Sequence, residues 1–384
     1  MHQSRLSYLD AQPNVIAPYR AAASIHSHTH HSKESLQFIP QFAEKYPLLK
    51  WALALQCGKS GIPVNFDRAY WTPPLNAEMS LQVEKSQIED KLGLASFVAL
   101  TDHDTIGAPL LLRALPDTKH VPLSLEWSAP FSGTMFHIGV HNLPEGRAQS
   151  IVNDLNQFTK EPNDTRFFEL LATLNELPDV LVVLNHPLWD ISECGQERHE
   201  QALGKFLETG GHFVHAVEMN ATRAWSENER AKALAEQWKL PFVGGGDRHG
   251  CDPSAAINLT NAETYSDFVH EIRDEQRAHI LVMPHANEPL CIRITQMLLD
   301  VIREYPEHPI GTRRWDNRVF HPGRTTDADT PVSTLWGTPP VAVGIVFSFL
   351  RLLDHSAVKN ALRQAIPREE GVRVTSGVSY EASS

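Results

Sequence analysis

Cysteine is scarce in this sequence, and its few copies are scattered. Cys57, Cys194, Cys251 and Cys291 lie far apart among 384 residues and form no CxxC pair. Four scattered cysteines in a chain of this length argue against a disulfide framework, and the absence of a CxxC pair argues against a zinc knuckle built on thiolates. A reducing cytoplasm is therefore the expected compartment.

Runs of positive charge and long apolar runs are also missing. The formal net charge is −12 and no cluster of Lys or Arg is present, so no nucleic-acid surface is expected. A small anionic substrate remains compatible, because it needs only local positive charge. The first ten residues, MHQSRLSYLD, lack the apolar segment of a signal peptide. The longest apolar stretch, Val341 to Leu353, contains Ser348 and Arg351 and is too short to span a bilayer, so it predicts a buried helix and no membrane contact.

Histidine, by contrast, is abundant. The chain has 20 histidines, in a composition of 42% apolar and 21% charged residues that is typical of a globular protein with a sizeable core. Histidine is the commonest metal ligand and a frequent proton carrier. The placement of these residues therefore decides which chemistry is expected.

Short apolar runs alternate with segments of helical periodicity along most of the chain. The predicted strands are 23–28, 97–101, 121–127, 136–142, 180–186, 216–220, 241–247 and 279–283. The predicted helices among them are 148–158, 166–176, 197–207, 227–239 and 262–277. The alternation predicts parallel βαβ units in an α/β fold, and about seven of them favour a barrel. The strands 121–127 and 136–142 are too close together for a helical crossover and predict a hairpin.

Two regions depart from this alternation. Residues 33–89 contain helical pieces, 48–56 and 79–91, around a loop rich in Pro and Trp, and are interpreted as an insertion. The predicted barrel domain therefore covers residues 20–285. Residues 286–384 are expected to form a helical C-terminal extension, with helices near 291–303 and 341–364 and a disordered tail.

The candidate ligands follow the predicted strands. His26 and His28 are two residues apart, so a strand places them on the same face. Other strand ends supply further His, Asp and Glu side chains: His103, Glu126, His137, His186, Glu218 and Asp247, with His249 close behind. Any one of them alone would fit a core histidine or a helix N-cap. Together they predict a metal site, because the carboxyl ends of barrel strands converge and buried ionisable groups need compensation. Imidazole and carboxylate without thiolate suit Mn²⁺, Fe²⁺ or Zn²⁺.

The ordered motifs HSH, TDHD, a strand-terminal Glu, a His eleven residues later, NHP and GDRH closely resemble the PHP (polymerase and histidinol phosphatase) superfamily. The resemblance covers about residues 20–285. It implies a distorted (β/α)7 TIM-like barrel that holds two or three metal ions and usually hydrolyses phosphoesters. Its implied ligands are His26, His28, His103, Glu126, His137, His186, Asp247 and His249. Glu126 would bridge two ions, the first held by His26, His28 and Asp247 and the second by His137 and His186. His103 and His249 would hold a third.

One position departs from the family pattern. Many members have an Asp seven residues after the first His, as a further ligand of the third ion, and here that position is Lys33. An ammonium group beside a dication is repulsive. Either the neighbouring Glu34 takes over through a shifted loop, or the third site is weak or empty.

The expected reaction is hydrolysis of a small phosphorylated substrate by a metal-activated hydroxide. Arg248, Arg223 and Lys33 are the candidate phosphate-binding cations, and for the two arginines a surface ion pair is the alternative role. His103 or His249 would protonate the leaving oxygen if the third ion is missing. Asp102 and Asp104 are expected to orient histidines, or else to cap a helix that starts near Ile106.

Two other functions compete with a phosphoesterase. An amidohydrolase-like barrel uses similar ligands but often adds a carboxylated Lys from a strand end, and no strand-terminal Lys is present here. A degenerate PHP-like barrel would serve as a binding module without catalysis, which the substitution at Lys33 favours and the otherwise full ligand set opposes. The sequence predicts neither the substrate identity nor the oligomeric state.

Overall fold

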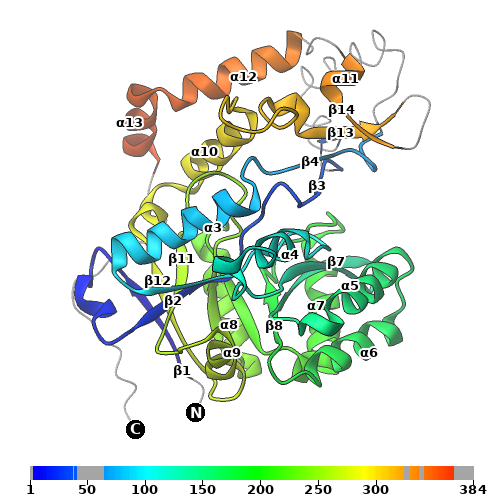
Figure 1. The fold of residues 1–384 in the computed structure, drawn as a ribbon, viewed down its shortest axis with the longest axis vertical. Helices are drawn as coiled ribbons and strands as arrows, with labels where there is room; N and C mark the ends of the chain where they lie inside the picture. Colours follow the sequence, from blue (N-terminus) through cyan, green and yellow to red (C-terminus); the bar gives the residue numbers. More distant parts are fainter. Residues whose placement is uncertain (1–2, 38, 41–64, 324–327, 337–340, 367–384) are drawn as a thin grey trace.

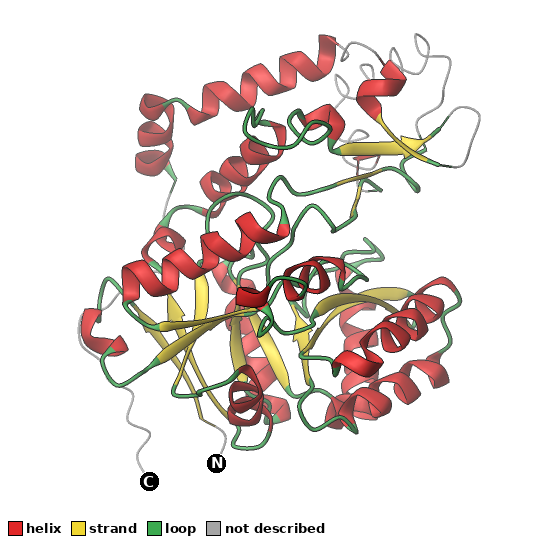
Figure 2. Cartoon of the chain, in the orientation of Figure 1, coloured by secondary structure: helices red, strands yellow, loops and turns green. Residues whose placement is uncertain are grey.

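A computed structural model describes residues 3–37, 39–40, 65–323, 328–336 and 341–366. The chain is a mixed α/β protein whose described strands form three sheets (Figures 1 and 2). Two five-stranded sheets and their helices make up the lower part of Figure 1. A four-stranded sheet and the C-terminal helices make up the upper part.

The first sheet has the order β1-β12-β11-β2-β5. Its strands are β1 (Gln3–Tyr8), β2 (Ala21–Ser24), β5 (Ala95–Val98), β11 (Ala256–Thr260) and β12 (Arg277–Val282). Strand β2 is parallel to β5, and β11 runs antiparallel to both of its neighbours. Strands β1 and β11 were not predicted. The buried Asn258 interrupts the apolar pattern of β11, and its side chain bonds the backbone N–H and C=O of Gly244 at 2.8 Å each.

The second sheet has the order β10-β9-β8-β7-β6. Its strands are β6 (Leu125–Phe131), β7 (Thr134–His141), β8 (Leu181–Asn185), β9 (Ala216–Asn220) and β10 (Phe242–Gly245). The predicted hairpin is confirmed: β6 and β7 are antiparallel. Its turn is only two residues, Ser132 and Gly133, with φ of 51° and 81°. Both strands are therefore longer than predicted on the turn side, and Pro130 lies within β6 rather than in a loop.

The two large sheets meet where several strands end. Isolated parallel bridges pair Ser27 with Arg248 and His103 with Glu126, which joins the end of β2 to the end of β10 and the end of β5 to β6. Among the described residues, continuous ladders occur only within each sheet. The predicted closed barrel therefore stays a prediction, while the bridges bring the ends of these strands together.

The helices predicted between the strands are present and mostly extend beyond the predicted limits. They are α5 (Glu145–Lys160), α6 (Asp164–Asn175), α7 (Gln196–Gly210), α8 (Trp225–Trp238) and α9 (Tyr265–Arg273). Shorter elements are α4 (Gly107–Arg113) and the 3₁₀ turns Pro13–Ile16, Pro116–Thr118, Gly211–Phe213, Pro284–Asn287 and Trp315–Asn317. The largest core cluster packs aromatic side chains of the hairpin, among them Trp127 and Phe131, against Phe167 of α6 and Phe206 of α7. This packing holds the hairpin against α6 and α7.

The insertion and the C-terminal extension share the third sheet. Its order is β14-β13-β4-β3, with β3 (Glu34–Ser35) and β4 (Tyr70–Trp71) from the insertion and β13 (Val319–Pro322) and β14 (Asp329–Pro331) from the extension. The extension is therefore not purely helical, contrary to the prediction. Of the predicted insertion helices, 48–56 lies outside the described residues. Helix 79–91 is α3 (Ala77–Ser86), continued by a π-helical turn, Gln87–Lys91.

The remaining helices of the extension are α10 (Leu290–Ile302), α11 (Val332–Trp336), α12 (Val341–Asp354) and α13 (Ser356–Ala365). The helix predicted over 341–364 is therefore two helices, divided at His355. The prediction that its apolar half is buried was wrong: Ile345, Phe349 and Leu352 are 66%, 58% and 58% exposed. None of the described helices has both the length and the apolarity needed to cross a bilayer. The predicted disordered tail lies outside the described residues.

His215 is buried directly before β9, at the other end of the strands from the bridges. Its Nδ1 accepts a hydrogen bond from the Val182 amide (2.9 Å) and its Nε2 donates to Asn175 Oδ1 (2.9 Å). Burial above all, and Arg273 in addition, lowers the pKa of His215 to about 3. The fold therefore requires the neutral ring.

We expect the protein to lose stability as the pH falls below 6.5, the ordinary pKa of the histidine in the unfolded chain. Between that value and the folded pKa the unfolded chain binds the extra proton, so this group lowers the free energy of unfolding by about 1.4 kcal/mol per pH unit. Urea unfolding above and below pH 6.5 measures the slope. His215→Gln should flatten it and the exposed His120→Gln should not; equal slopes for wild type and His215→Gln would contradict the assignment.

Candidate metal centre

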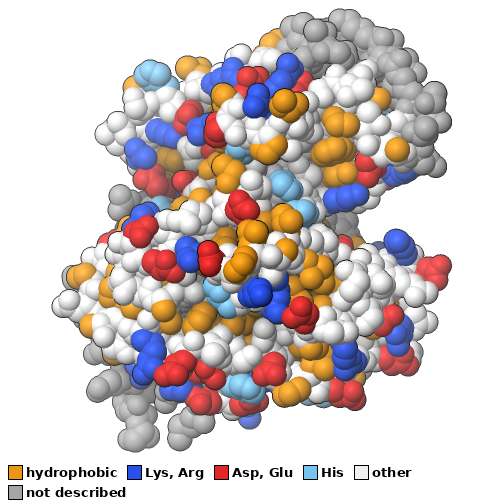
Figure 3. All heavy atoms as spheres, in the orientation of Figure 1, with side chains coloured by type: hydrophobic (Ala, Val, Ile, Leu, Met, Phe, Trp, Pro, Cys, Tyr) orange, Lys and Arg blue, Asp and Glu red, His pale blue; other side chains and the backbone are white. Residues whose placement is uncertain are grey.

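The structure brings all eight predicted ligands together at the strand ends where the two large sheets meet. Nitrogen and oxygen atoms of seven of these side chains and of Glu34 form three overlapping groups, and within each group the atoms lie within 4.8 Å of one another. The eighth, His186, lies beside them, with its Nε2 3.2 Å from Glu126 Oε1. The groups are His26, His28, Glu126 and Asp247; then His103, Glu126 and His137; then His28, Glu34, His103 and His249. Histidine side chains are visible in Figure 3 at the waist between the upper and lower parts of the molecule.

The first group is fully buried and agrees with the set predicted for one ion. His26 Nε2 lies 3.3 Å from Glu126 Oε2 and 3.6 Å from Asp247 Oδ1. His28 Nε2 lies 3.3 Å from Glu126 Oε2 and 3.4 Å from Asp247 Oδ1. Two imidazoles and two carboxylates thus face one point, which is the arrangement of a cation cage rather than of separate ion pairs.

Glu126 connects the first group to the second. Its Oε2 faces His26 and His28, whereas its Oε1 lies 3.4 Å from His137 Nδ1 and 3.2 Å from His186 Nε2. Asn185 donates to the same Oε1 at 2.9 Å and fixes the carboxylate. The two oxygens therefore point to different sets of imidazoles, as a carboxylate that bridges two ions would.

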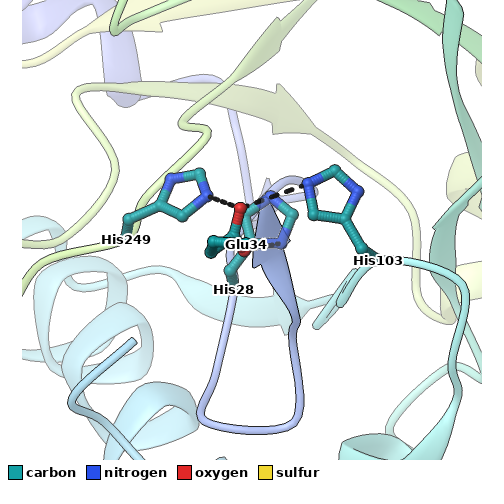
Figure 4. A group of neighbouring side chains, drawn as sticks. All are labelled: His28, Glu34, His103 and His249. Carbon is teal, nitrogen blue, oxygen red and sulfur yellow. Dashed lines mark ion pairs between the residues drawn. The ribbon is translucent and has the colours of Figure 1, made fainter. Parts of the chain in front are cut away.

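Glu34 completes the third group, where the family pattern would place its Asp at position 33. Its Oε2 lies 3.1 Å from His249 Nε2 and 3.4 Å from His103 Nε2, and its Oε1 lies 3.8 Å from His28 Nδ1 (Figure 4). Lys33 faces the other way, 61% exposed and paired with Asp329 at 3.0 Å. Of the two alternatives left open by the sequence, the structure favours the shift to Glu34, and Lys33 is not placed to bind a substrate in the cluster.

The buried carboxylates of the cluster need positive charge nearby to remain ionised. Burial opposes ionisation of Glu126, yet His26, His137 and His103 hold its pKa well below the usual range. Burial also opposes protonation of His103, yet Glu34 and Glu126 raise its pKa to about 10. Protons on His26 and His103 thus balance the carboxylates, while burial lowers the pKa of His137 to about 4 and leaves that ring neutral. A divalent cation supplies the same balance by displacing these protons, so its affinity rises with pH.

Unsatisfied atoms point to the same conclusion. Four buried atoms of the cluster have no hydrogen-bond partner among the described residues: Glu34 Oε1, His103 Nδ1, Glu126 Oε2 and His186 Nδ1. An orphaned buried polar atom costs about 1–3 kcal/mol, so such atoms are rare without a ligand. Imidazole and carboxylate donors fit Mn²⁺, Fe²⁺ or Zn²⁺. These buried groups could therefore hold metal ions.

Glu218 supports the ligands and was given no role in the sequence-based prediction, although its place at a strand end was noted. Its Oε1 lies 2.5 Å from His26 Nδ1, and its Oε2 accepts the backbone N–H of His186 (2.9 Å) and the side chain of Asn220 (3.0 Å). A carboxylate on the far nitrogen of a ligand histidine fixes the tautomer and the ring orientation. Glu218 thus presents Nε2 of His26 to the first group.

Gly245 on β10 makes room for Glu218. A Cβ at position 245 would lie 1.6 Å from Glu218 Oε1, so Gly245→Ala must displace the carboxylate. We expect a fall in metal affinity of about 10–100-fold, the usual effect of losing a residue that orients a ligand. Equilibrium dialysis against Mn²⁺ measures it. Gly146→Ala in α5, where a Cβ meets open space, is the matched control; an unchanged affinity in Gly245→Ala would remove Glu218 from this role.

Arg248 is a correction to the sequence-based prediction, which placed it among the catalytic residues as a phosphate-binding cation. Its guanidinium is buried and turned toward α3. It pairs with Glu84 (Nε to Oε1, 2.9 Å) and also donates to the carbonyls of Gly250 and His28 and to the hydroxyl of Ser80. With its donors used in this way, Arg248 ties the insertion to the ligand-bearing loop.

The other predicted polar roles also changed. Asp102 accepts from the backbone N–H (2.5 Å) and hydroxyl (2.8 Å) of Thr29, and Asp104 accepts from the Ser128 amide (2.8 Å). They hold the loops that carry the ligands, and neither caps α4, whose N-cap residue is Ile106. Arg223 remains beside the site: its guanidinium lies 4.5 Å from the ring centre of Trp189, which packs on His186, and pairs with Glu227.

Comparisons with known proteins give distant structural likeness only. No protein-family model and no curated protein matches the chain. An amidohydrolase from Chromobacterium violaceum, with bound sulfate and no metal, is 14% identical with a TM-score of 0.32, over 47% of this chain and 84% of that one. PsfC from Pseudomonas syringae PB-5123 is 20% identical (TM-score 0.38; 58% and 89%). A candidate metal-dependent phosphoesterase from Bifidobacterium adolescentis is 16% identical (TM-score 0.30; 52% and 91%).

Proposed function

We propose that this protein is a metal-dependent hydrolase of the PHP type, with a distorted barrel around its strand ends, that cleaves small phosphoesters. One observation carries the proposal: the two oxygens of the buried Glu126 face two different groups of ligand-type side chains. A bridging carboxylate between neighbouring ions is the arrangement in which metal hydrolases stabilise both the attacking and the leaving oxygen.

The residues of the chain have separate tasks in this proposal. Bound divalent ions supply Lewis acidity and a nucleophile from water near neutral pH. Glu126 sets the distance between the first two groups, Asp247 adds a second carboxylate to the first, and Glu218 orients His26. His103, His249 and Glu34 would hold a further ion, and if only two ions bind, His103 or His249 would donate a proton to the leaving oxygen.

Phosphoesters are preferred to amides as substrates for two reasons. None of the described strands contains the Lys that a bridging carbamate would need, Lys33 is exposed and paired with Asp329, and Glu126 would take the bridging position. The cation that we assign to the substrate is Arg223, which lies against Trp189 and would exchange its pair with Glu227 for an anionic group. An amidohydrolase-like activity stays as the second candidate, because the ligand types are compatible with both.

Metal analysis and a substrate panel test the proposal together. The purified protein should contain two or three equivalents of Mn²⁺, Fe²⁺ or Zn²⁺, and should hydrolyse members of a panel of phosphomonoesters and phosphodiesters in preference to matched amides. Asp247→Asn should lower both metal content and rate. Less than one equivalent of metal, with no effect of Asp247→Asn, would instead identify a non-catalytic binding module.

A further inference from the structure

Glu34, a member of the third ligand group, lies on a strand that is too short to be stable without its neighbours. Strand β3 consists of Glu34 and Ser35 alone, and its pairing partners are Trp71 and Tyr70 of β4. A two-residue strand contributes too few hydrogen bonds to be stable in isolation. The position of Glu34 therefore depends on the strands that lie beyond β4.

Those strands come from the C-terminal extension, about 285 residues later in the chain. Strand β4 pairs with β13, in the register Trp71 with Val319 and Tyr70 with Phe320, and β13 pairs with β14. The Thr72 amide adds a hydrogen bond to the Arg318 carbonyl at 2.8 Å. A continuous set of backbone hydrogen bonds thus runs from the extension to the carboxylate that faces His249 and His103.

Side chains connect the same elements. Asp329 of β14 accepts from Lys33 Nζ (3.0 Å) and from the Tyr70 hydroxyl (3.1 Å), so it connects the residue before Glu34 with the strand partner of the residue after it. Tyr70 stacks on Phe320 with ring centres 5.0 Å apart. Trp71 lies against His249, 5.7 Å between ring centres. The sheet therefore touches the third group through two residues, Glu34 and Trp71.

We propose that strands β13 and β14 of the extension position Glu34, so that the ion of the third group and the C-terminal extension stabilise each other. The proposal rests on the metal-dependent function proposed above. Coupling of this kind is reciprocal: whatever free energy the ordered sheet adds to ion binding, the ion returns to the sheet. Lys33, which cannot itself be a ligand, acts as a positioning residue through its pair with Asp329.

Hydrogen exchange of the whole wild-type chain during stepwise addition of Mn²⁺ tests the coupling. Filling of the last equivalent should slow exchange in β13 and β14, and Glu34→Gln should bind one equivalent fewer and lose this protection. Protection of these strands by the last ion supports the proposal. Normal ion binding with unchanged exchange in β13 and β14 overturns it and leaves the proposed function intact. Binding of no metal by the wild type overturns both.

Asp329→Ala tests whether the Lys33–Asp329 pair contributes to the position of Glu34. It should weaken only the weakest Mn²⁺ site, by about two- to fivefold, the range expected for a partly exposed ion pair. Glu307→Ala, another exposed acid of the extension, is the matched control and should change nothing. The conservative variant Asp329→Glu keeps the negative charge and should retain affinity, which separates loss of the pair from a general loss of structure. Equal affinities in Asp329→Ala and the wild type overturn the role of this pair.

Discussion

Replacement of Glu126 by glutamine is expected to lower kcat/KM on the best phosphoester by on the order of 10³-fold and to release at least one equivalent of metal. The amide removes a negative charge that faces two ligand groups, and it can offer only one acceptor oxygen where the carboxylate offers two. Loss of a charge that stabilises the transition state in a water-excluded site has effects of this order.

Steady-state kinetics and elemental analysis of the same preparation measure this prediction. Glu263→Gln is the matched control, because this carboxylate is 76% exposed and pairs only with the exposed Arg20. A cooperative thermal transition establishes that the Glu126 variant is folded. Full activity and full metal content in that folded variant would mean that Glu126 is not a bridging ligand, and the proposed function would have to be abandoned.

Glu84→Ala is expected to destabilise the fold by about 3–5 kcal/mol, the usual cost of removing one partner from a buried ion pair. Glu84 is fully buried in α3, and the side chain of Arg248, its partner, is only 4% exposed. The same carboxylate also accepts from the Ser24 hydroxyl and the Ser254 amide. The substitution leaves a guanidinium buried without a counter-charge.

Urea unfolding measures this change in the free energy of unfolding. Glu145→Ala, which breaks the exposed pair with Arg113, should cost less than about 1 kcal/mol and serves as the control. Because Arg248 lies between Asp247 and His249 in the chain, metal affinity should fall along with stability. A loss below about 1 kcal/mol in Glu84→Ala would show that Arg248 finds another partner or reaches water.

The sequence predicted the ligand cluster well, because strand ends meet by geometry. Seven of the eight predicted ligands share the three groups, and His186 lies 3.2 Å from Glu126. The prediction that Glu126 ends a strand was wrong: β6 begins at Leu125, so Glu126 and His137 lie within the hairpin strands and reach the cluster through the hairpin pairing. The assignment of Arg248 failed for a complementary reason. Its partner, Glu84, is 164 residues away in the insertion, and nothing local in the sequence indicates that pairing.

Long-range pairing also decides whether Lys33 or Glu34 faces the cluster. Which of two adjacent residues faces the cluster depends on the register of β3 with β4, and that sheet is completed by residues 319–331. Strand β11 was missed because the polar Asn258 interrupts its apolar pattern, and β1 because its polar sequence, QSRLSY, has little of the usual signal. Local patterns thus predicted elements and ligand types, while long-range pairing decided the fine assignment.

The two-residue turn of the hairpin sets the register of β6 with β7, and through it the relative position of two of the candidate ligands. Glu126 is paired with Gly139 and His137 with Ser128, so Glu126 and His137 are diagonal neighbours on one face of the ribbon. Insertion of one residue in that turn would send one of the two to the opposite face. A change in cation radius would therefore have to be met by ligands outside the hairpin, because backbone pairing sets the relative positions of Glu126 and His137.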